Sequence, residues 1–364
     1  MSKFAFILHA VIAKDVAFKY PVLKFLPDSL IEKVIRHISP RVLSHIDGVK
    51  SLTGAETEGW FVGCPLTTKQ LIEDDPAVSI RKIVECGKIA QELGAEVVGL
   101  GAYTAIVGDA GKSIAAALDI GVTTGNSYTI VTAVEGAINA AEAMGINPKD
   151  VRAAVLGATG SIGKACARLL AGKVAEIDVV GRRDHATERV VTELRDAGID
   201  NVRALTDIPK ALAASDIVIT VTSAISDVVP AEALRPGAVI CDVARPRDVS
   251  RAVALKRDDV LVIEGGVVDV PGDVDFHFEF GFPPKTAYAC MAETMMLGLE
   301  GMTDDYSIGR DIAPDQVDEI SGLAQKHGFK LAGFRSFERN VDPAFIQKTR
   351  ERAEKARAKA GITV

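Results

Sequence analysis

The chain has 364 residues, of which 48% are hydrophobic and 5% aromatic, and its formal net charge is −7. This length predicts two domains or one large α/β unit, and the acidic balance argues against a nucleic-acid surface. The five cysteines are scattered, with no CxxC pair and no histidine at metal-ligand spacing. This usage disfavours disulfides and a metal site, and it favours a reducing, cytoplasmic setting.

The N-terminal run FAFILHAVIA at 4–13 is apolar but too short to span a membrane, so it predicts a first buried strand. The following stretch at 20–38 is amphipathic, with Leu26, Leu30, Val34 and Ile38 at helical spacing. We expect that face to pack on the domain. The alternative is a helix that rests peripherally on a membrane surface.

Helical and strand patterns alternate in the next part of the chain. Residues 78–94 place apolar side chains on one helical face and end at a glycine, and 95–105 predict a strand that runs into a loop. Residues 126–145 predict a long, alanine-rich helix whose start is capped by Asn126 or Ser127.

From residue 151 the pattern becomes strictly βαβ. The predicted strands are nearly continuous runs of Val and Ile, as strands covered on both faces require. They span 151–157, 176–182, 216–223, 237–244 and 260–266, and helices are predicted at 160–172 and 186–197. The pattern predicts a doubly wound, parallel-sheet nucleotide-binding domain.

A glycine-rich loop joins the first strand and helix of this domain. In VLGATGSIGKA, Gly157 permits a tight turn, Gly160 lets the backbone approach a pyrophosphate, and Gly163 allows close helix packing. The spacing is GxxGxxG, a departure from GxGxxG. The candidate cofactor contacts in and beyond this loop are Gly157, Thr159, Gly160, Ser161, Ile162, Gly163, Thr222 and Gly265.

The end of the second strand carries Arg182 and Arg183, where an NAD-specific site usually places an acid for the ribose hydroxyl. Two guanidinium groups suit a 2′-phosphate, because their fork geometry matches phosphate oxygens. The sequence therefore predicts NADPH as the cofactor, although the adjacent Asp184 leaves NAD open.

After Pro283 and Pro284 the chain is predicted helical to about residue 300. From 335 onward it is highly charged, with eight basic and four acidic residues, and 344–360 predicts a solvated terminal helix. The alternative role for this basic segment is docking of an acidic partner.

Several segments together resemble the long-chain acyl-[acyl-carrier-protein] reductases known best from cyanobacteria, within the superfamily of shikimate dehydrogenase and glutamyl-tRNA reductase. The resemblance covers residues 4 to 330. It is carried by GAYTAIV (101–107), TTGNSYT (123–129), GATGSIG (157–163), EGGVVDVPGDVDF (264–276), AYACMAETMMLGLEG (287–301), SIGR (307–310) and HGF (327–329).

The resemblance implies an α/β fold with a substrate-binding domain at 1–125, an NADP-binding Rossmann domain at 126–284 led by an interdomain helix, and C-terminal helices at 285–364 that fold back on the substrate domain. It also implies that Cys290 attacks a long-chain acyl thioester of acyl carrier protein or coenzyme A. Hydride from NADPH would then release a fatty aldehyde, which a downstream aldehyde-using enzyme could take up. Lys285 and His277 are the local candidates for activating the thiol.

Two other functions stay open. A shikimate-type alcohol dehydrogenase would use Lys69, but the aspartate it needs is replaced in Asn126-Ser127-Tyr128, which removes half of the acid–base pair. A non-catalytic NADPH-binding regulator would bind the cofactor and never consume it. Cys166 and Cys241 lie in a predicted helix and a predicted strand, where small buried thiols are ordinary packing residues.

Overall fold

The computed structural model describes residues 1–10, 12–14, 25–224, 227–244, 246–279, 281–337 and 339–362. The chain divides into two compact units, and each is discontinuous in sequence. Unit 1 comprises residues 1–128 and 268–330, and unit 2 comprises 129–267 and 331–364. Within the described ranges, no helix combines the length and apolar character that crossing a bilayer requires.

Unit 1 is built on a six-stranded sheet in the order β13-β2-β3-β1-β4-β5. Strands β1, β3, β4 and β5 are parallel, while β2 and β13 are antiparallel to their neighbours. The sheet strands are β1 (Lys3–Ala10), β2 (Arg41–Lys50), β3 (Glu56–Thr67), β4 (Val97–Leu100), β5 (Gly121–Thr123) and β13 (Gly272–Asp275). The helices are α2 (Asp28–Ile35), α3 (Thr68–Glu73), α4 (Pro76–Glu92), α5 (Lys112–Ala115), α11 (Ala289–Glu300) and α12 (Pro314–His327), with a 3₁₀ turn η2 (Ala102–Ala105).

Helix α11 crosses one face of this sheet, against β4, β1 and β3. Glycines allow the close approach. A Cβ on Gly99 of β4 would come closer than 3.0 Å to Thr294 of the helix, and Gly298 of the helix lies over Phe4 of β1. The N-terminal end of α11 therefore points towards the carboxyl ends of the parallel strands, where α/β proteins bind their ligands.

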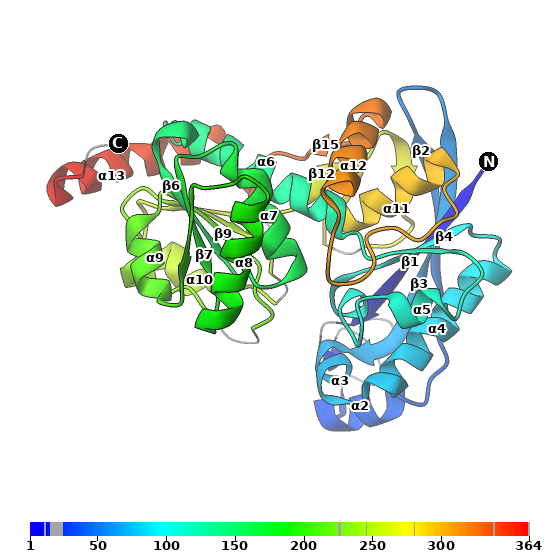
Figure 1. The fold of residues 1–364 in the computed structure, drawn as a ribbon. Helices are drawn as coiled ribbons and strands as arrows, with labels where there is room; N and C mark the ends of the chain where they lie inside the picture. Colours follow the sequence, from blue (N-terminus) through cyan, green and yellow to red (C-terminus); the bar gives the residue numbers. More distant parts are fainter. Residues whose placement is uncertain are drawn as a thin grey trace. The chain divides into compact units, whose positions relative to one another are not determined.

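Unit 2 is a doubly wound domain, in green to yellow in Figure 1, with the terminal helix in red. Its six strands are all parallel, in the order β11-β10-β9-β6-β7-β8. They are β6 (Arg152–Leu156), β7 (Glu176–Val180), β8 (Val202–Leu205), β9 (Ile217–Thr220), β10 (Val239–Asp242) and β11 (Leu261–Glu264). The helices are α7 (Ser161–Ala171), α8 (Asp184–Asp196), α9 (Ile208–Ala214), α10 (Arg251–Lys256) and α13 (Pro343–Ala360), with 3₁₀ turns η3 (Pro148–Asp150) and η4 (Ala231–Ala233). The predicted fold class, an α/β protein with a doubly wound parallel sheet, is confirmed.

Helix α6 (Asn126–Ala143) begins in unit 1 and continues into unit 2. The remaining strands are short. They are β12 (Val267–Asp269), β14 (Thr286–Tyr288), β15 (Lys330–Leu331), β16 (Arg335–Ser336) and β17 (Arg339–Asn340).

The unit boundaries differ from the expected ones at three places. Residues 126–128 were expected in the nucleotide domain but lie in unit 1. Residues 268–284 were also expected in the nucleotide domain but lie in unit 1, because β13 forms the edge of its sheet and pairs antiparallel with β2. The segment 331–364 was expected on the substrate domain but lies in unit 2. There the buried guanidinium of Arg357 donates to the carbonyls of Pro236 and Gly237 at 3.0 and 3.2 Å.

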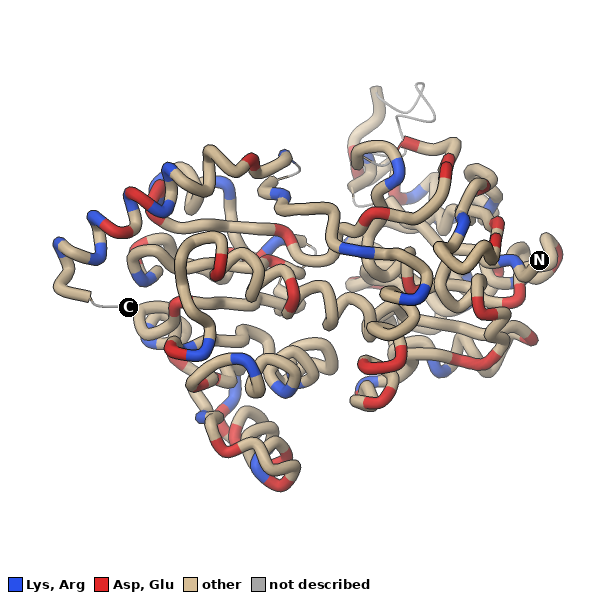
Figure 2. The backbone as a smooth tube through the Cα atoms, turned by 90° about the horizontal axis from the view of Figure 1, so that it is seen from above, with Lys and Arg blue, Asp and Glu red and all other residues tan. Residues whose placement is uncertain are grey.

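Helix α13 is therefore packed along one side and is not fully solvated. Ile346, Thr349 and Ala353 are buried together with Arg357. Along the helix, basic and acidic residues are interspersed, as Figure 2 shows, and Arg350 pairs with Glu354 at 3.1 Å. The sequence predicted a solvated helix because an arginine is normally assigned to the surface. Arg357 is instead buried together with the apolar side of the helix.

The predicted packing face of the 20–38 stretch needs correction. Residues 20–24 lie outside the described residues, and the described part forms α2. Ile31 and Ile35 are its buried residues, whereas Leu30 and Val34 are 42% and 40% exposed. The helix begins only at Asp28, so Leu26 and Ile38 flank it and the buried stripe is shifted by one residue.

Candidate functional site

Cys290 is the second residue of α11 and is half-buried. The other four cysteines are buried: Cys64, Cys86, Cys166 and Cys241. Burial raises the pKa of the Cys166 thiol to about 12, so that residue stays protonated. A helix N-terminus is one of the environments that favour a thiolate, and Tyr288, which precedes the helix, provides no side-chain cap that would compete there. Among the five thiols, only Cys290 combines accessibility with such a position.

Gly125 lies directly against Cys290. It follows β5 with a φ of +72°, a conformation that glycine adopts without strain. A Cβ at this position would come closer than 3.0 Å to the Cα and Cβ of Cys290 and would lie 3.0 Å from its carbonyl carbon. The backbone at the start of α6 therefore touches the backbone at the start of α11.

A buried carboxylate joins the same two helix ends. Glu293 is one turn after Cys290 on α11 and is fully buried. Its two carboxylate oxygens accept from the Thr123 hydroxyl at 2.5 Å and from the backbone N–H of Tyr128 at 2.7 Å. Burial raises the pKa of this carboxyl, and these hydrogen bonds oppose the shift. Glu293 was absent from the residues predicted from sequence, although its spacing of three from Cys290 places both on one side of a helix.

The start of α6 differs from expectation in its capping. The Tyr128 N–H in the first turn of α6 is bound by Glu293 of another helix. The Ser127 hydroxyl instead lies 2.6 Å from the Ser307 hydroxyl, and Thr124 donates to the Ser307 carbonyl at 2.5 Å. The stretches 123–129 and 307–310, singled out in the sequence, thus meet beside Cys290.

The two predicted activating cations lie elsewhere. Lys285 donates to Asp273 at 2.6 Å, and the His277 ring bonds Asp47 of β2 at 3.0 Å. The hydrogen bond to Asp47 raises the pKa of the exposed His277 imidazole. Strand β2 is four strand positions from β5, about 19 Å across the sheet, and Cys290 lies against the residue that follows β5. The structure does not bring His277 to the thiol.

Lys69, the candidate base of an alcohol dehydrogenase, is on α3. Its ammonium pairs with Glu32 at 3.6 Å, and its side chain is 59% exposed. The acid that would share a substrate hydroxyl with it is not in the sequence at 126–128. The arrangement has the ordinary features of a surface ion pair.

The glycine loop of unit 2 has the geometry that a dinucleotide requires. Gly157 has a φ of +82°, and a Cβ there would lie 2.7 Å from the Val221 carbonyl. A Cβ on Gly163 would lie 2.8 Å from the Cα of Ala158, so this glycine permits close packing of α7. Gly160 is open, with its nearest neighbour at 3.4 Å. The loop lies between β6 and β9, where the strand order reverses and such domains bind dinucleotides.

Other predicted loop contacts flank this site. Thr159, Ser161 and Ile162 lie within the loop and the first turn of α7. Thr222 follows β9, and its hydroxyl and N–H both donate to the buried Asp248, at 2.5 and 2.9 Å. Gly265 follows β11 and is buried. Thr222 thus has a structural partner for both donors, which the sequence did not indicate.

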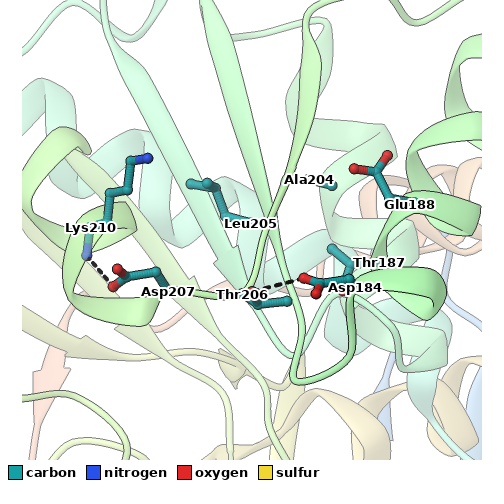
Figure 3. Close-up of a pocket in the computed structure, with 8 residues that line it drawn as sticks. All are labelled: Asp184, Thr187, Glu188, Ala204, Leu205, Thr206, Asp207 and Lys210. Atoms are coloured by element: carbon teal, nitrogen blue, oxygen red, sulfur yellow. Dashed lines mark hydrogen bonds between the residues drawn. The ribbon is translucent and has the colours of Figure 1, made fainter.

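Arg182 and Arg183 follow β7 and are exposed, and neither guanidinium has a hydrogen-bond or ion-pair partner among the described residues. The neighbouring Asp184 begins α8 and accepts from Thr206 at 2.9 Å. Figure 3 shows that its carboxylate is directed to Thr206, in a pocket that Lys210 also lines. Asp184, the acid that could bind the ribose hydroxyl of NAD, is thus hydrogen-bonded to Thr206 of the same unit.

Comparison with known proteins finds a family match within unit 2. The sequence model of the "Shikimate / quinate 5-dehydrogenase" family matches residues 139–264. A solved structure of quinate dehydrogenase from Corynebacterium glutamicum in complex with NAD is 14% identical, covers 67% of this chain and 80% of its own, and has a TM-score of 0.35. The strand order, the loop geometry and the family match over 139–264 agree that unit 2 has a Rossmann-type, dehydrogenase-like nucleotide-binding fold.

Two curated relatives match most of the chain. "Aminotransferase PigE" from Serratia sp. is 32% identical over 297 residues, which is 81% of this chain but only 35% of PigE. The chain thus spans about a third of that protein. "Long-chain acyl-[acyl-carrier-protein] reductase" from Synechococcus elongatus is 28% identical over 307 residues, 80% of this chain and 87% of the relative.

Proposed function

We propose that this chain is an NADPH-dependent reductase that converts a long-chain fatty acyl thioester to a fatty aldehyde through an acyl-enzyme on Cys290. The observation that carries the proposal is the position of Cys290. It is the accessible thiol of the five, and it lies in the first turn of α11. A nucleophilic cysteine needs both access and a setting that favours the thiolate.

In the first step, the Cys290 sulfur bonds to the thioester carbonyl carbon. The bond from that carbon to the carrier sulfur breaks, and the carrier leaves as a thiolate that takes up a proton. The acyl group is now held on Sγ as a second thioester. NADPH, when bound, supplies the hydride that reduces this thioester, and Cys290 leaves as a thiolate. One thioester, one hydride and one proton thus give one aldehyde and one free carrier thiol.

The preference for NADPH over NADH rests on two exposed cations. Arg182 and Arg183 lie at the carboxyl end of β7 with unengaged guanidinium groups, while Asp184 is held by Thr206. Charge-assisted hydrogen bonds from arginine to phosphate are strong and directional. A cofactor that carries a 2′-phosphate therefore gains interactions at this strand end that NADH does not offer.

The substrate class is supported by the acyl-[acyl-carrier-protein] reductase relative, of which this chain covers 87%. We extend the acyl donor to coenzyme A, since both carriers present the same thioester on a phosphopantetheine arm. Helix α11, which carries Cys290, also contributes three buried methionines, Met291, Met295 and Met296. Methionine adapts its shape readily and suits a site that receives flexible alkyl chains.

The test is intact-protein mass after incubation with palmitoyl-coenzyme A without NADPH. We expect a palmitoyl adduct on the wild-type protein and none on Cys290→Ala. Addition of NADPH should discharge the adduct and release palmitaldehyde. Cys64→Ala and Cys166→Ala serve as matched controls, because they remove buried thiols and should leave the adduct in place.

If neither palmitoyl-coenzyme A, palmitoyl-acyl carrier protein nor shorter-chain donors acylate the wild-type protein, the proposal fails. An adduct that persists in Cys290→Ala would assign the nucleophile to another residue. NADPH that binds and is never consumed by any thioester would favour a regulator, and turnover of a hydroxy acid would favour the dehydrogenase.

A further inference from the structure

Glu293 has a role at Cys290 that neither the sequence patterns nor the comparisons assign. It is a fully buried carboxyl on a largely apolar helix, where Ala289, Met296 and Leu297, three or four residues away, are buried on the same side. Burying an ionisable group is unfavourable unless hydrogen bonds compensate, so a residue in this position requires a reason. Its partners give that reason.

The partners of Glu293 belong to the segment that touches Cys290. Thr123 is the last residue of β5, and Tyr128 lies in the first turn of α6. By accepting from the Thr123 hydroxyl and the Tyr128 N–H, the carboxylate connects both ends of the bend at 123–128. The Thr123 hydroxyl oxygen also accepts from the Gly125 N–H at 3.1 Å. Gly125, in the middle of that bend, is the residue in contact with Cys290.

Three interactions thus close a loop of contacts around the thiol. Glu293 is hydrogen-bonded to both ends of the 123–128 bend, and Gly125 in that bend contacts the backbone of Cys290. Cys290 and Glu293 are themselves one turn apart on α11. The Cys290 carbonyl also accepts from the Thr294 hydroxyl at 3.0 Å, an additional hydrogen bond within the same stretch of α11. Because the contact at Gly125 is between backbone atoms, a shift of the bend moves the start of α11 with it.

We propose that Glu293 is a positioning residue for Cys290: it clamps the 123–128 bend to α11 and thereby fixes the thiol at the helix N-terminus in the orientation needed to attack a thioester. The proposal rests on the proposed function for its consequence, but the placement of the thiol is separately measurable. Glu293 is fully buried and both of its oxygens are engaged by Thr123 and Tyr128, so it acts on the reaction only through Cys290.

A conservative variant separates position from charge. In Glu293→Gln the amide oxygen can accept from the Tyr128 N–H while the amide nitrogen donates to the Thr123 hydroxyl oxygen, so the clamp is kept without the negative charge. Glu293→Ala removes both. Thr123→Val is a milder variant, nearly isosteric with threonine, that removes one anchor of the clamp and the acceptor for Gly125.

Two measurements follow on these variants. The first is the rate of Cys290 acylation by palmitoyl-coenzyme A, followed by intact mass. We expect Glu293→Ala to be slower by roughly 30- to 100-fold, because a displacement of about 1 Å costs that much in a positioned reaction. Glu293→Gln should stay within about threefold of the wild type, as expected when geometry is retained.

The second measurement needs no acyl substrate. The pH profile of Cys290 alkylation by iodoacetamide is followed by peptide mass spectrometry. The midpoint for Glu293→Ala should lie about 0.2 to 0.7 of a pH unit above that for Glu293→Gln, since a thiol displaced from the helix end loses the stabilisation of its thiolate. A role in folding alone would shift the melting temperature and leave this difference at zero.

Equal loss of acylation in Glu293→Gln and Glu293→Ala would overturn the proposal, since charge and not position would then be responsible. Unchanged acylation and an unchanged alkylation profile in Glu293→Ala, or in Thr123→Val should the alanine variant not fold, would overturn it as well. If the wild-type protein accepts no acyl group from any thioester, the proposed function falls, while the alkylation profiles still decide whether Glu293 positions the thiol.

Discussion

Replacing Gly125 with alanine tests the contact on which the candidate site depends. The new Cβ would come closer than 3.0 Å to the Cα and Cβ of Cys290, whereas carbon atoms in contact normally lie about 3.5–4.0 Å apart. The two backbones must therefore separate by more than about 0.5 Å. Neither atom belongs to a flexible side chain, so the strain has to move the bend, the start of α11, or both.

Two costs add in this variant. A φ of +72° disfavours any L-residue by about 1–2 kcal/mol, and overpacking a tight contact costs about 1–3 kcal/mol. We expect the free energy of unfolding to fall by roughly 2–5 kcal/mol, measured by urea denaturation. Acylation of Cys290 should slow by about 100-fold under conditions where the protein remains folded, because the displacement is at the reacting residue.

Gly322→Ala is the matched control in the same unit. Gly322 lies within α12 with ordinary helical backbone and nothing within 4 Å of a new Cβ. Alanine should raise stability there by about 0.5–1 kcal/mol and leave acylation unchanged. Wild-type stability and acylation in Gly125→Ala would refute the reasoning, since the contact between the two helix ends would then not constrain the thiol.

Three further predictions concern charge. Removing Arg182 and Arg183 together should raise the KM for NADPH by about 10- to 150-fold and leave that for NADH unchanged, as steady-state kinetics with both cofactors would reveal. Burial raises the folded-state pKa of Glu293 above its ordinary value of 4.5, so the folded state binds more protons than the unfolded chain around that pH. The free energy of unfolding should therefore fall as pH rises from about 4.5 through the folded pKa, and urea midpoints for Glu293→Gln should lack that slope. Arg357→Met should destabilise unit 2 by about 1–3 kcal/mol in urea denaturation, since two carbonyls lose their donor, whereas Lys355→Met on the exposed side of α13 should be neutral.

The nucleotide domain was predictable because its signals are local. Five of its six parallel strands are short apolar runs, and the glycines at 157, 160 and 163 follow from the turn and packing that the loop requires. The boundaries of those five strands fell within three residues of the predicted ones. The edge strand β8 (Val202–Leu205) was not predicted, because Arg203 interrupts its apolar run. The unit boundaries were not predictable in the same way, since they depend on the pairing of β13 with β2, more than two hundred residues away in sequence.

The activating groups proposed for Cys290 show the same limit. Lys285 and His277 were chosen because they are near Cys290 in sequence, but a strand and turn can carry a near neighbour to another edge of the sheet. Both cations have carboxylate partners on β13 or its neighbour β2, Asp273 for Lys285 and Asp47 for His277. The distant residue in contact with Cys290 is Gly125, and Ser307 bonds Thr124 and Ser127 of the same segment. Periodicity carries no information about such distant contacts.

Glu293 was overlooked for a different reason. On a helix that is buried along nearly its whole length, a single carboxyl three residues after the cysteine was not weighed as a partner of another helix. Its role can be inferred only from the folded structure, in which Thr123 and Tyr128 donate to its two carboxylate oxygens. The same packing explains why Cys290 looks like a core residue in sequence, since α11 is apolar because it crosses the sheet. Its neighbours Ala289 and Met291 are buried, and Cys290 is the residue of this turn that keeps some exposure, which an apolar sequence pattern does not reveal.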